Sequence, residues 1–507
     1  MILSKTDYIL YRDCPKNVWL KIHKPEIYSD ILSDFEMNII QSGNEVELIA
    51  RKLFEGGILI DGRDKKAEQV TVSYLESKEG VLFQPLFVTE KFLAAIDVLE
   101  YIPDNDSYIL YEIKSTNGID DKVHYHDVAF QVNLLRQKGL NVSKACLIHL
   151  NSEYVRYGEL KIEDNQLFKI VDVTSEVESL SEEVVTEMDM AHEYISQESE
   201  PRGYCACVYK GRSKHCTMFK YSNPDIPEYG IHDIARIGSS KAKLQELADN
   251  NVFKLEDIPA HVKLSEIQKN QVESYLYNKT IRNDTEINLL LNDLKYPLYF
   301  LDYETYPCAI PRFDGFSPYQ QIPFQYSLHI LKSPQDKLEH TEFLYSDKDD
   351  PTPPLVTALK NDIGETGTVI VWNKKFECKI NEEIGQRIPL YQAFMESVNN
   401  RIFDLMDIFS RQHYVHKNFK GSTSIKYVLP ALVPELHYAD LNIREGGTAS
   451  DRWNKVSTGA IVGVDAESII EDLRKYCGRD TEAMYAIWYH LFQAQQGKDE
   501  STVELAF

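Results

Sequence analysis

Hydrophobic and polar positions over the first 175 residues alternate between helical and strand patterns. Ser4 is placed to cap a helix that runs through Tyr11, Cys14 and Trp19, and a second helix is expected over residues 43–54. The elements expected after these are, in chain order, strands over 82–88, 92–101 and 108–115, a helix over 126–138 and a strand over 144–150. Helices that interrupt strands in this way predict a mixed α/β core.

The pattern changes twice in the rest of the chain. Residues 176–200 are rich in glutamate and end before Pro201, which predicts a connecting helix or linker. A domain boundary is expected at 292–296, because an apolar run begins a new strand there and an α/β pattern returns. We therefore expect an α/β protein of two domains joined by a short helical region, with domains over 1–220 and 295–507 and the connector over 221–294.

Composition and charge exclude several classes of protein. The 507 residues are 43% hydrophobic and 26% charged, as in soluble globular proteins. Apolar runs are far shorter than the roughly 20 residues that cross a bilayer, so no membrane partner is expected. Met1-Ile2-Leu3 leads directly into polar residues, so no signal peptide is expected and a cytoplasmic location follows.

The net charge of −24 argues against broad electrostatic coating of nucleic acid. It leaves a metal-dependent nuclease open, because such active sites are themselves acidic. A local basic segment can coexist with an acidic chain, and one candidate consists of Lys210, Arg212, Lys214, His215 and Lys220. An ordinary solvated loop is the alternative for this segment.

Eight cysteines are present, and structural disulfides are not expected in a reducing compartment. Cys205, Cys207 and Cys216 fall within twelve residues, which indicates a metal ion or cluster. The other cysteines apart from Cys14, namely Cys146, Cys308, Cys378 and Cys477, are interpreted as small packing residues.

A first set of chemical groups lies on the predicted strand 108–115. Glu112 and Lys114 are two residues apart, so their side chains share one face of the strand. Asp97 lies fifteen residues earlier on a strand that can pair with this one as a hairpin. The two carboxylates suit Mg²⁺ or Mn²⁺, and Lys114 can orient a water that the metal activates. An exposed salt bridge is the alternative for so short a pattern.

A second set lies in the last two hundred residues. Asp302 and Glu304 follow an apolar run and share one face of a strand. Tyr476 and Asp480 are four residues apart, which puts them on one side of a helix. Asp480 would add a metal ligand to the two strand carboxylates, and Tyr476 could orient the attacking water.

The first 220 residues resemble the PD-(D/E)xK nuclease superfamily, specifically its RecB-type branch with iron–sulfur clusters. Residues 43–47 match the early helix motif of that branch, with Glu47 where a metal-binding histidine is usual. Gln131 matches the glutamine of a later helix motif, in which Leu135 replaces the expected tyrosine. The resemblance implies a restriction-endonuclease-like core in which metal is held by Glu47, Asp97 and Glu112, and catalysis involves Asp97, Glu112, Lys114 and Gln131.

The cysteines extend this resemblance. In RecB-type nucleases of this branch, and in CRISPR adaptation exonucleases, one N-terminal cysteine joins three C-terminal ones around a 4Fe-4S cluster. The matching positions here are Cys14, Cys205, Cys207 and Cys216, although one residue separates the close pair instead of two. Zinc, with His215 as a substitute ligand, is the alternative. Either centre is expected to clasp the two ends of the domain.

The C-terminal region resembles the DnaQ-like 3′–5′ exonucleases of the DEDD type, which implies a ribonuclease-H-like core. Asp302-Tyr303-Glu304 fits the first motif of that family, and Tyr476 with Asp480 fits the tyrosine version of the third. The middle motif resembles residues 372–377, with Glu377 where aspartate is expected. Asp404 and Asp407 are competing candidates for this ligand, and exposed acids at a helix start are their alternative interpretation. Residues 231–506 also resemble an uncharacterised bacterial domain found behind RecB-type nucleases.

Together these features predict a nuclease that depends on Mg²⁺ or Mn²⁺ and has two active sites. The expected substrate is DNA that is single-stranded or has free ends, in repair, CRISPR adaptation or phage defence, and RNA stays open. Departures at Glu47, Leu135 and Glu377 motivate one alternative, in which one domain cuts and the other is a nucleic-acid-binding platform. A non-catalytic iron–sulfur adaptor for nucleic acid or protein is the other.

Overall fold

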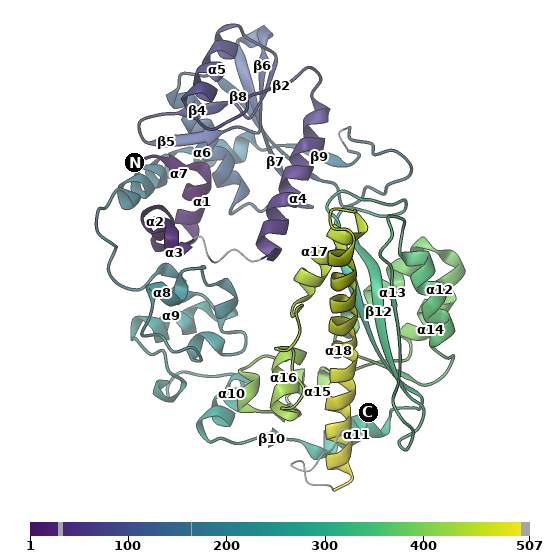
Figure 1. Cartoon of the computed structure of the whole chain (residues 1–507). Helices are drawn as coiled ribbons and strands as arrows, with labels where there is room; N and C mark the ends of the chain where they lie inside the picture. The colour runs from purple at the N-terminus through teal and green to yellow at the C-terminus, as the bar shows by residue number, and fades with distance from the viewer. Residues whose placement is uncertain (29–33, 164, 498–507) are drawn as a thin grey trace. The chain divides into compact units, whose positions relative to one another are not determined.

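The computed structural model describes residues 1–28, 34–163 and 165–497 and contains a mixed α/β chain with several sheets (Figure 1). The chain divides into two compact units. The first comprises Met1–Ile226 with Cys308–Gln320, and the second comprises Pro227–Pro307 with Gln321–Phe507. Most of the stretch expected as a connector, 221–294, thus groups with the second unit. Among the described residues, no helix is long and apolar enough to cross a membrane.

The first unit contains a six-stranded and a three-stranded sheet. The strands of the larger sheet, in spatial order, are β2 (Ile58–Leu59), β3 (Val81–Phe83), β6 (Val98–Ile102), β7 (Ser107–Lys114), β8 (Val142–Leu150) and β9 (Phe168–Asp172). The smaller sheet has the order β1 (Leu3–Ser4), β5 (Phe92–Ala95), β4 (Leu86–Val88). The helices are α1 (Lys5–Asp13), α2 (Pro15–His23), α3 (Pro25–Tyr28), α4 (Asp34–Ala50), α5 (Lys65–Glu76), α6 (His124–Gln137), α7 (Thr174–Ile195) and α8 (Phe219–Ser222).

Helix α6 forms the centre of this unit. It connects the parallel strands β7 and β8, which require a crossover because a tight turn cannot join parallel strands. Its apolar residues, such as Phe130 and Leu134, share one buried cluster with Val184 and Met188 of α7. The glutamate-rich segment expected to connect domains is therefore a helix of the core, with its acidic residues on the outer face.

Three elements expected to be continuous are broken, and the breaks position functional side chains. The predicted helix through Trp19 ends at Cys14, because Pro15 starts a new helix and disfavours helical backbone in the residue before it. Pro85 likewise separates β3 from β4, which pair in different sheets. Residues Ile96 and Asp97 separate β5 from β6. The predictions of one helix and of two long strands were wrong at these points.

The second unit contains a five-stranded sheet and a two-stranded one. The larger sheet has the order β13 (Glu339–Leu344), β12 (Gln321–Leu331), β11 (Leu298–Pro307), β14 (Thr368–Val371), β15 (Ile402–Asp404), and the smaller pairs β10 (Ile281–Arg282) with β16 (Tyr414–Val415). The helices are α9 (Lys241–Asp249), α10 (Glu266–Leu276), α11 (Asp284–Asn292), α12 (Thr352–Asp362), α13 (Lys374–Arg387), α14 (Gln392–Asn399), α15 (Asp407–Ser410), α16 (Ile425–Leu432), α17 (Gly446–Ser457) and α18 (Val464–Gln495).

Alternation along β11 decides which side chains reach which layer of the second unit. Tyr299, Leu301 and Tyr303 pack in one cluster with residues of α12, α13 and α14. Phe300, on the opposite face, packs against Tyr485 and Trp488 of α18. Figure 1 shows the long helix α18 along one side of this sheet and α12–α14 along the other. Because side chains alternate between faces, Asp302 and Glu304 point to the α18 side with Phe300.

Residues 308–320, between β11 and β12, are built into the first unit. Ile310 is buried in a cluster with Val46 of α4 and Ile113 of β7. The guanidinium of Arg156 donates hydrogen bonds to the carbonyls of Pro311 (2.9 Å) and Arg312 (2.8 Å). This segment therefore completes the core beneath β7, the strand that carries Glu112 and Lys114.

Replacing Ile310 with alanine should destabilise the first unit by about 2–4 kcal/mol, because it leaves a cavity under β7. Ile310 is 4% exposed. Hydrogen–deuterium exchange of the β7 peptide in the full chain should accelerate. Leu48→Ala is the matched control, since Leu48 is 61% exposed. Equal exchange in the two variants would contradict the assignment of this segment to the core.

Candidate functional site

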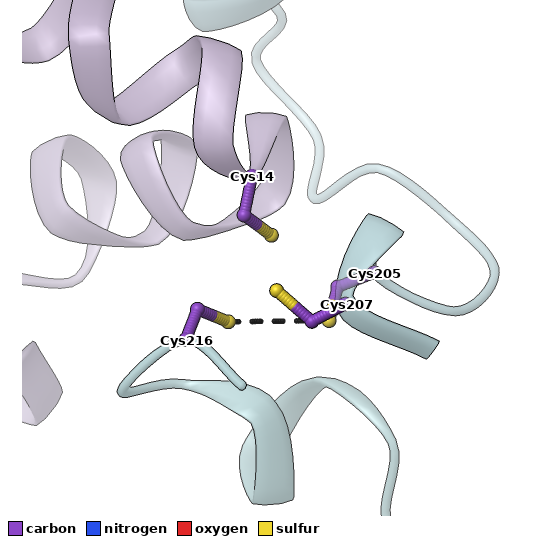
Figure 2. A group of neighbouring side chains, drawn as sticks. All are labelled: Cys14, Cys205, Cys207 and Cys216. Carbon is purple, nitrogen blue, oxygen red and sulfur yellow. Dashed lines mark hydrogen bonds between the residues drawn. The ribbon is translucent and has the colours of Figure 1, made fainter. Parts of the chain in front are cut away.

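Four cysteines from distant parts of the first unit come together, and all four are buried. Cys14 lies at the break between α1 and α2, Cys205 and Cys207 lie at the start of the 3-10 helix η4 (Ala206–Tyr209), and Cys216 follows η5 (Arg212–Lys214). Their sulfur atoms all lie within 4.8 Å of one another, and Figure 2 shows them turned toward a common centre. This arrangement can hold a metal.

The surroundings of the cysteines suit thiolate ligands. The amide of Asn223 donates to Cys205 Sγ at 3.3 Å, and its carbonyl accepts from the Cys205 N–H at 3.0 Å. Hydrogen bonds within the group lower the pKa of Cys205 and Cys207, which favours the form that binds metal, and raise the pKa of Cys14 and Cys216. His215, the predicted substitute ligand, instead stacks on Phe219 with ring centroids 3.5 Å apart.

In the first unit, the predicted residues of the Glu-x-Lys pattern converge as well. The Glu112 carboxylate, 2% exposed, accepts from Lys114 Nζ at 2.8 Å and from Gln131 Nε2 at 2.8 Å. Asp97 accepts from the Ile113 N–H at 2.9 Å, so it is fixed beside the same strand. Glu47 reaches this group through Gln84, whose amide donates to both Glu47 and Asp97.

Sequence reasoning missed three participants in this group: Lys5, Gln84 and Asp127. Lys5 Nζ lies 2.8 Å from both oxygens of Glu112 and 3.8 Å from Asp97 Oδ1. Asp127 pairs with Lys114. Asp127 lies four residues before Gln131 on the predicted helix, so the helical spacing already placed the two on one face. For Lys5 and Gln84 the sequence contains no comparable signal.

The electrostatics of this group rest on the two lysines. Burial alone would raise the pKa of Glu112, but the charges of Lys114 and Lys5 outweigh it and hold that pKa well below its usual range. Burial and the neighbouring Glu112 charge raise the pKa of Asp97 to about 7. The Lys5 ammonium occupies the position of a cation between the carboxylates of Asp97 and Glu112.

In the second unit, the predicted acids line a single pocket of about 300 Å³. Asp302 and Glu304 come from β11, Glu377 from the first turn of α13, and Tyr476 and Asp480 from α18. Other lining residues include Trp372, Phe376, Ile425, Lys426 and Met484. Acidic groups thus gather against a largely apolar wall, where a cation interacts strongly because little water screens it.

Burial dominates the charge state of these acids. It raises the pKa of Asp302, Glu304 and Glu377 well above their usual values, and their mutual repulsion adds to the effect. The Oε2 atom of Glu377, a residue 3% exposed, has no hydrogen-bond partner among the described residues. Buried carboxylates that lack partners are costly unless a cation compensates them, so this pocket suits divalent metal.

The choice of the fourth acid falls on Glu377, since Asp404 and Asp407 do not line the pocket. The Asp404 carboxylate accepts from the backbone N–H groups of Lys374 (2.9 Å) and Met406 (3.1 Å). Asp407 pairs with Arg411 at 2.5 Å. Cys477, predicted to be a packing residue, is buried with its sulfur 4.0 Å from Asp302 Oδ2. Asp302, Glu304 and Cys477 also form a group able to hold an ion.

Tyr438 was missed by sequence reasoning. Its hydroxyl donates to Asp480 Oδ1 at 2.5 Å, which, with Lys426, offsets the effect of burial on Asp480. The net result is a pKa of about 6 for Asp480. Tyr438 lies in a loop 42 residues before its partner, and no spacing rule connects such positions.

Replacing Cys207 with alanine should remove nearly all of the metal that copurifies with the chain, because it deletes one of four converging ligands. Elemental analysis of the purified protein measures this. Cys146→Ala, which changes a buried cysteine of β8 outside the group, should keep the metal. Equal metal content in both variants would show that the four cysteines hold none.

Mn²⁺ affinity at the second-unit pocket should rise about tenfold or more from pH 6 to pH 8, because the ion displaces protons from carboxyl groups with raised pKa values. Calorimetry of the Asp97→Asn variant in two buffers of different ionisation enthalpy reports the affinity and the protons released. Adding Asp302→Asn should abolish this binding. An affinity that is unchanged or falls with pH would contradict the assignment.

Part of the chain is similar to one protein-family model and to one other protein. Residues 299–424 match the model of a family described as a domain of unknown function (DUF2779). This range includes Asp302, Glu304 and Glu377 and stops before Asp480. The chain is also similar to the uncharacterized protein UU173 of Ureaplasma parvum serovar 3 (strain ATCC 700970), with 26% identity over 246 residues. That match covers 42% of this chain and 36% of the relative, so the chain spans about a third of its length.

Proposed function

We propose that this protein is a metal-dependent nuclease with two active sites, one in each compact unit. The observation that carries the proposal is the second-unit pocket, which Asp302, Glu304, Glu377 and Asp480 line together and in which one oxygen of Glu377 has no partner among the described residues. Two divalent ions, Mg²⁺ or Mn²⁺, would offset four such charges. Carboxylates that hold two metals are a common arrangement for phosphodiester hydrolysis.

Each unit supports one of the two resemblances. In the first, a Glu-x-Lys strand, an aspartate beside it and a glutamine on the next helix converge, which supports a PD-(D/E)xK core of the RecB type. In the second, a five-stranded mixed sheet lies between α18 and α12–α14, with two acids on its central strand. This arrangement supports a DnaQ-like exonuclease with a ribonuclease-H-like core.

The reaction would be hydrolysis of a phosphodiester bond. A bond forms between a water oxygen and phosphorus, the bond from phosphorus to a sugar oxygen breaks, and the water proton goes to solvent while the leaving oxygen gains one. Bound metal would supply charge stabilisation and a more acidic water. In the first unit, Lys114 would orient that water, and ion pairs with Glu112 and Asp127 would hold the Lys114 ammonium group in place. In the second, Tyr476 has the corresponding role.

The four cysteines could hold either a zinc ion or a 4Fe-4S cluster, and these two proposals require different distances between the sulfur atoms. Four thiolates around one zinc ion stand about 3.8 Å apart, from a zinc–sulfur distance of about 2.3 Å. Cys205 and Cys216 have sulfur atoms 4.0 Å apart, which fits a single ion. The family resemblance instead implies a 4Fe-4S cluster, which needs the thiolates further apart. Iron with acid-labile sulfide, or zinc, in the purified protein distinguishes the two. Either centre suits a reducing cytoplasm.

The proposed substrate is DNA that is single-stranded or has free ends. The 300 Å³ pocket suits one nucleotide better than a continuous duplex. Trp372 and Phe376 on its wall offer aromatic faces for a base. The chain carries a net charge of −24, so binding would depend on bound metal and local contacts more than on long-range attraction.

A second candidate function keeps one active site and makes the first unit a binding platform. The specific observation is Lys5, which already neutralises Glu112 and lies near Asp97. A site that holds its own cations has less need of metal. Comparing the cleavage activities of a Lys114→Ala variant in the first unit and an Asp302→Asn variant in the second decides between these two functions.

With Mn²⁺ and end-labelled single- and double-stranded DNA and RNA, Lys114→Ala and Asp302→Asn should each lower cleavage about 100-fold on different substrates, because the first removes the group that orients the attacking water and the second removes a metal ligand. Lys379→Ala, on an exposed part of α13, is the control and should cut as the parent does. Loss in Asp302→Asn alone would support the single-site version. Cleavage of none of these substrates by the parent protein would refute the proposal.

A further inference from the structure

Lys426 occupies the second-unit pocket without a direct ion pair to its acids. The residue lies on α16, is half-buried and lines the pocket beside Asp302, Glu304 and Asp480. Its ammonium group lies 5.5 Å from the ring centroid of Tyr476 and 5.8 Å from that of Tyr438. It also donates a hydrogen bond to the Arg444 carbonyl at 2.5 Å. Two aromatic faces and a carbonyl therefore hold a cation at the edge of the acidic group.

The charge of Lys426 reaches three of the four acids. It lowers the pKa of Asp302, of Glu304 and of Asp480, against the larger effect of burial. Lys5 in the first unit differs, since it bonds directly to both oxygens of Glu112. Lys5 thus lies on the carboxylate oxygens of Glu112, whereas the contacts of Lys426 with the two tyrosine rings and the Arg444 carbonyl involve none of the second-unit acids.

We propose that Lys426 is a catalytic residue of the second-unit site, where its ammonium group contacts a non-bridging oxygen of the phosphate that is cut. This inference rests on the nuclease function proposed above. Negative charge on the non-bridging oxygens must be stabilised as the water attacks, and a cation already held in place stabilises it without reorganising. Lys426 transfers no proton or group in this step.

The environment of Lys426 fits this role. The rings of Tyr438 and Tyr476 restrict the ammonium without neutralising it, because a ring face attracts a cation but carries no net charge. The Tyr438 hydroxyl is at the same time bonded to Asp480, so one residue holds both a metal ligand and the lysine. A phosphate that enters the pocket supplies the negative partner that Lys426 lacks among the acids.

The test compares Lys426→Met and Lys426→Arg in the full chain with its cysteine centre intact. With Mn²⁺ and end-labelled single-stranded DNA, Lys426→Met should lower kcat about 100-fold, and Lys426→Arg should recover part of that loss. Mn²⁺ binding to Lys426→Met, measured by calorimetry, should be as tight as in the parent or tighter, because a repelling charge is gone. Lys379→Met, whose side chain is 64% exposed on α13, is the control and should match the parent.

Three outcomes would overturn the inference, and they differ in what else fails. If Asp302→Asn abolishes cleavage while Lys426→Met stays within about twofold of the parent, only the role of Lys426 is wrong. If Lys426→Met loses Mn²⁺ binding together with cleavage, Lys426 is structural. If the parent cuts no substrate, or Asp302→Asn cuts as the parent does, the proposed function of this site fails and the inference fails with it.

Discussion

The burial of several carboxylates close together is the constraint on which both acidic sites depend: loss of water raises the pKa of most of these acids, and repulsion between them adds to that rise. In the first unit, Lys5 and Lys114 bond directly to Glu112 and keep it ionised despite burial. In the second unit, Lys426 acts on the acids without bonding to them, and burial raises the pKa of Asp302, Glu304 and Glu377 far above their usual values. One site therefore carries its own counter-ions, whereas the other gains most from bound cations.

Interruptions and alternation in the backbone bring these groups together. Cys14 reaches the other cysteines because Pro15 ends α1 there, and Asp97 reaches Glu112 because it lies between β5 and β6 and accepts from the Ile113 N–H. In the second unit, alternation along β11 sends Asp302 and Glu304 toward α18, while Tyr303 on the other face is fixed by a hydrogen bond to Asn381. Packing on one face of β11 thus fixes the orientation of the carboxylates on the other face.

Local patterns in the sequence predicted those features of the sites that depend on residues close together in the chain. The period of two fixed the shared face of Glu112 and Lys114, and helical spacing paired Tyr476 with Asp480. The helix around Gln131 was also found where predicted, in α6. Lys5 and Tyr438 escaped prediction because each meets its partner only through tertiary packing, 107 and 42 residues away. The breaks at Cys14 and Asp97 escaped because hydrophobic periodicity continues across them.

Anomalous diffraction from crystals of the full chain grown with Mn²⁺ tests the central claim most directly, because it locates the ions at their ligands. We expect Mn²⁺ peaks within bonding distance of Asp302, Glu304 and Asp480, and a further peak between Asp97 and Glu112 with Lys5 moved off Glu112. The absence of Mn²⁺ from the second-unit pocket at saturating concentration, with its carboxyl groups unchanged, would contradict the account.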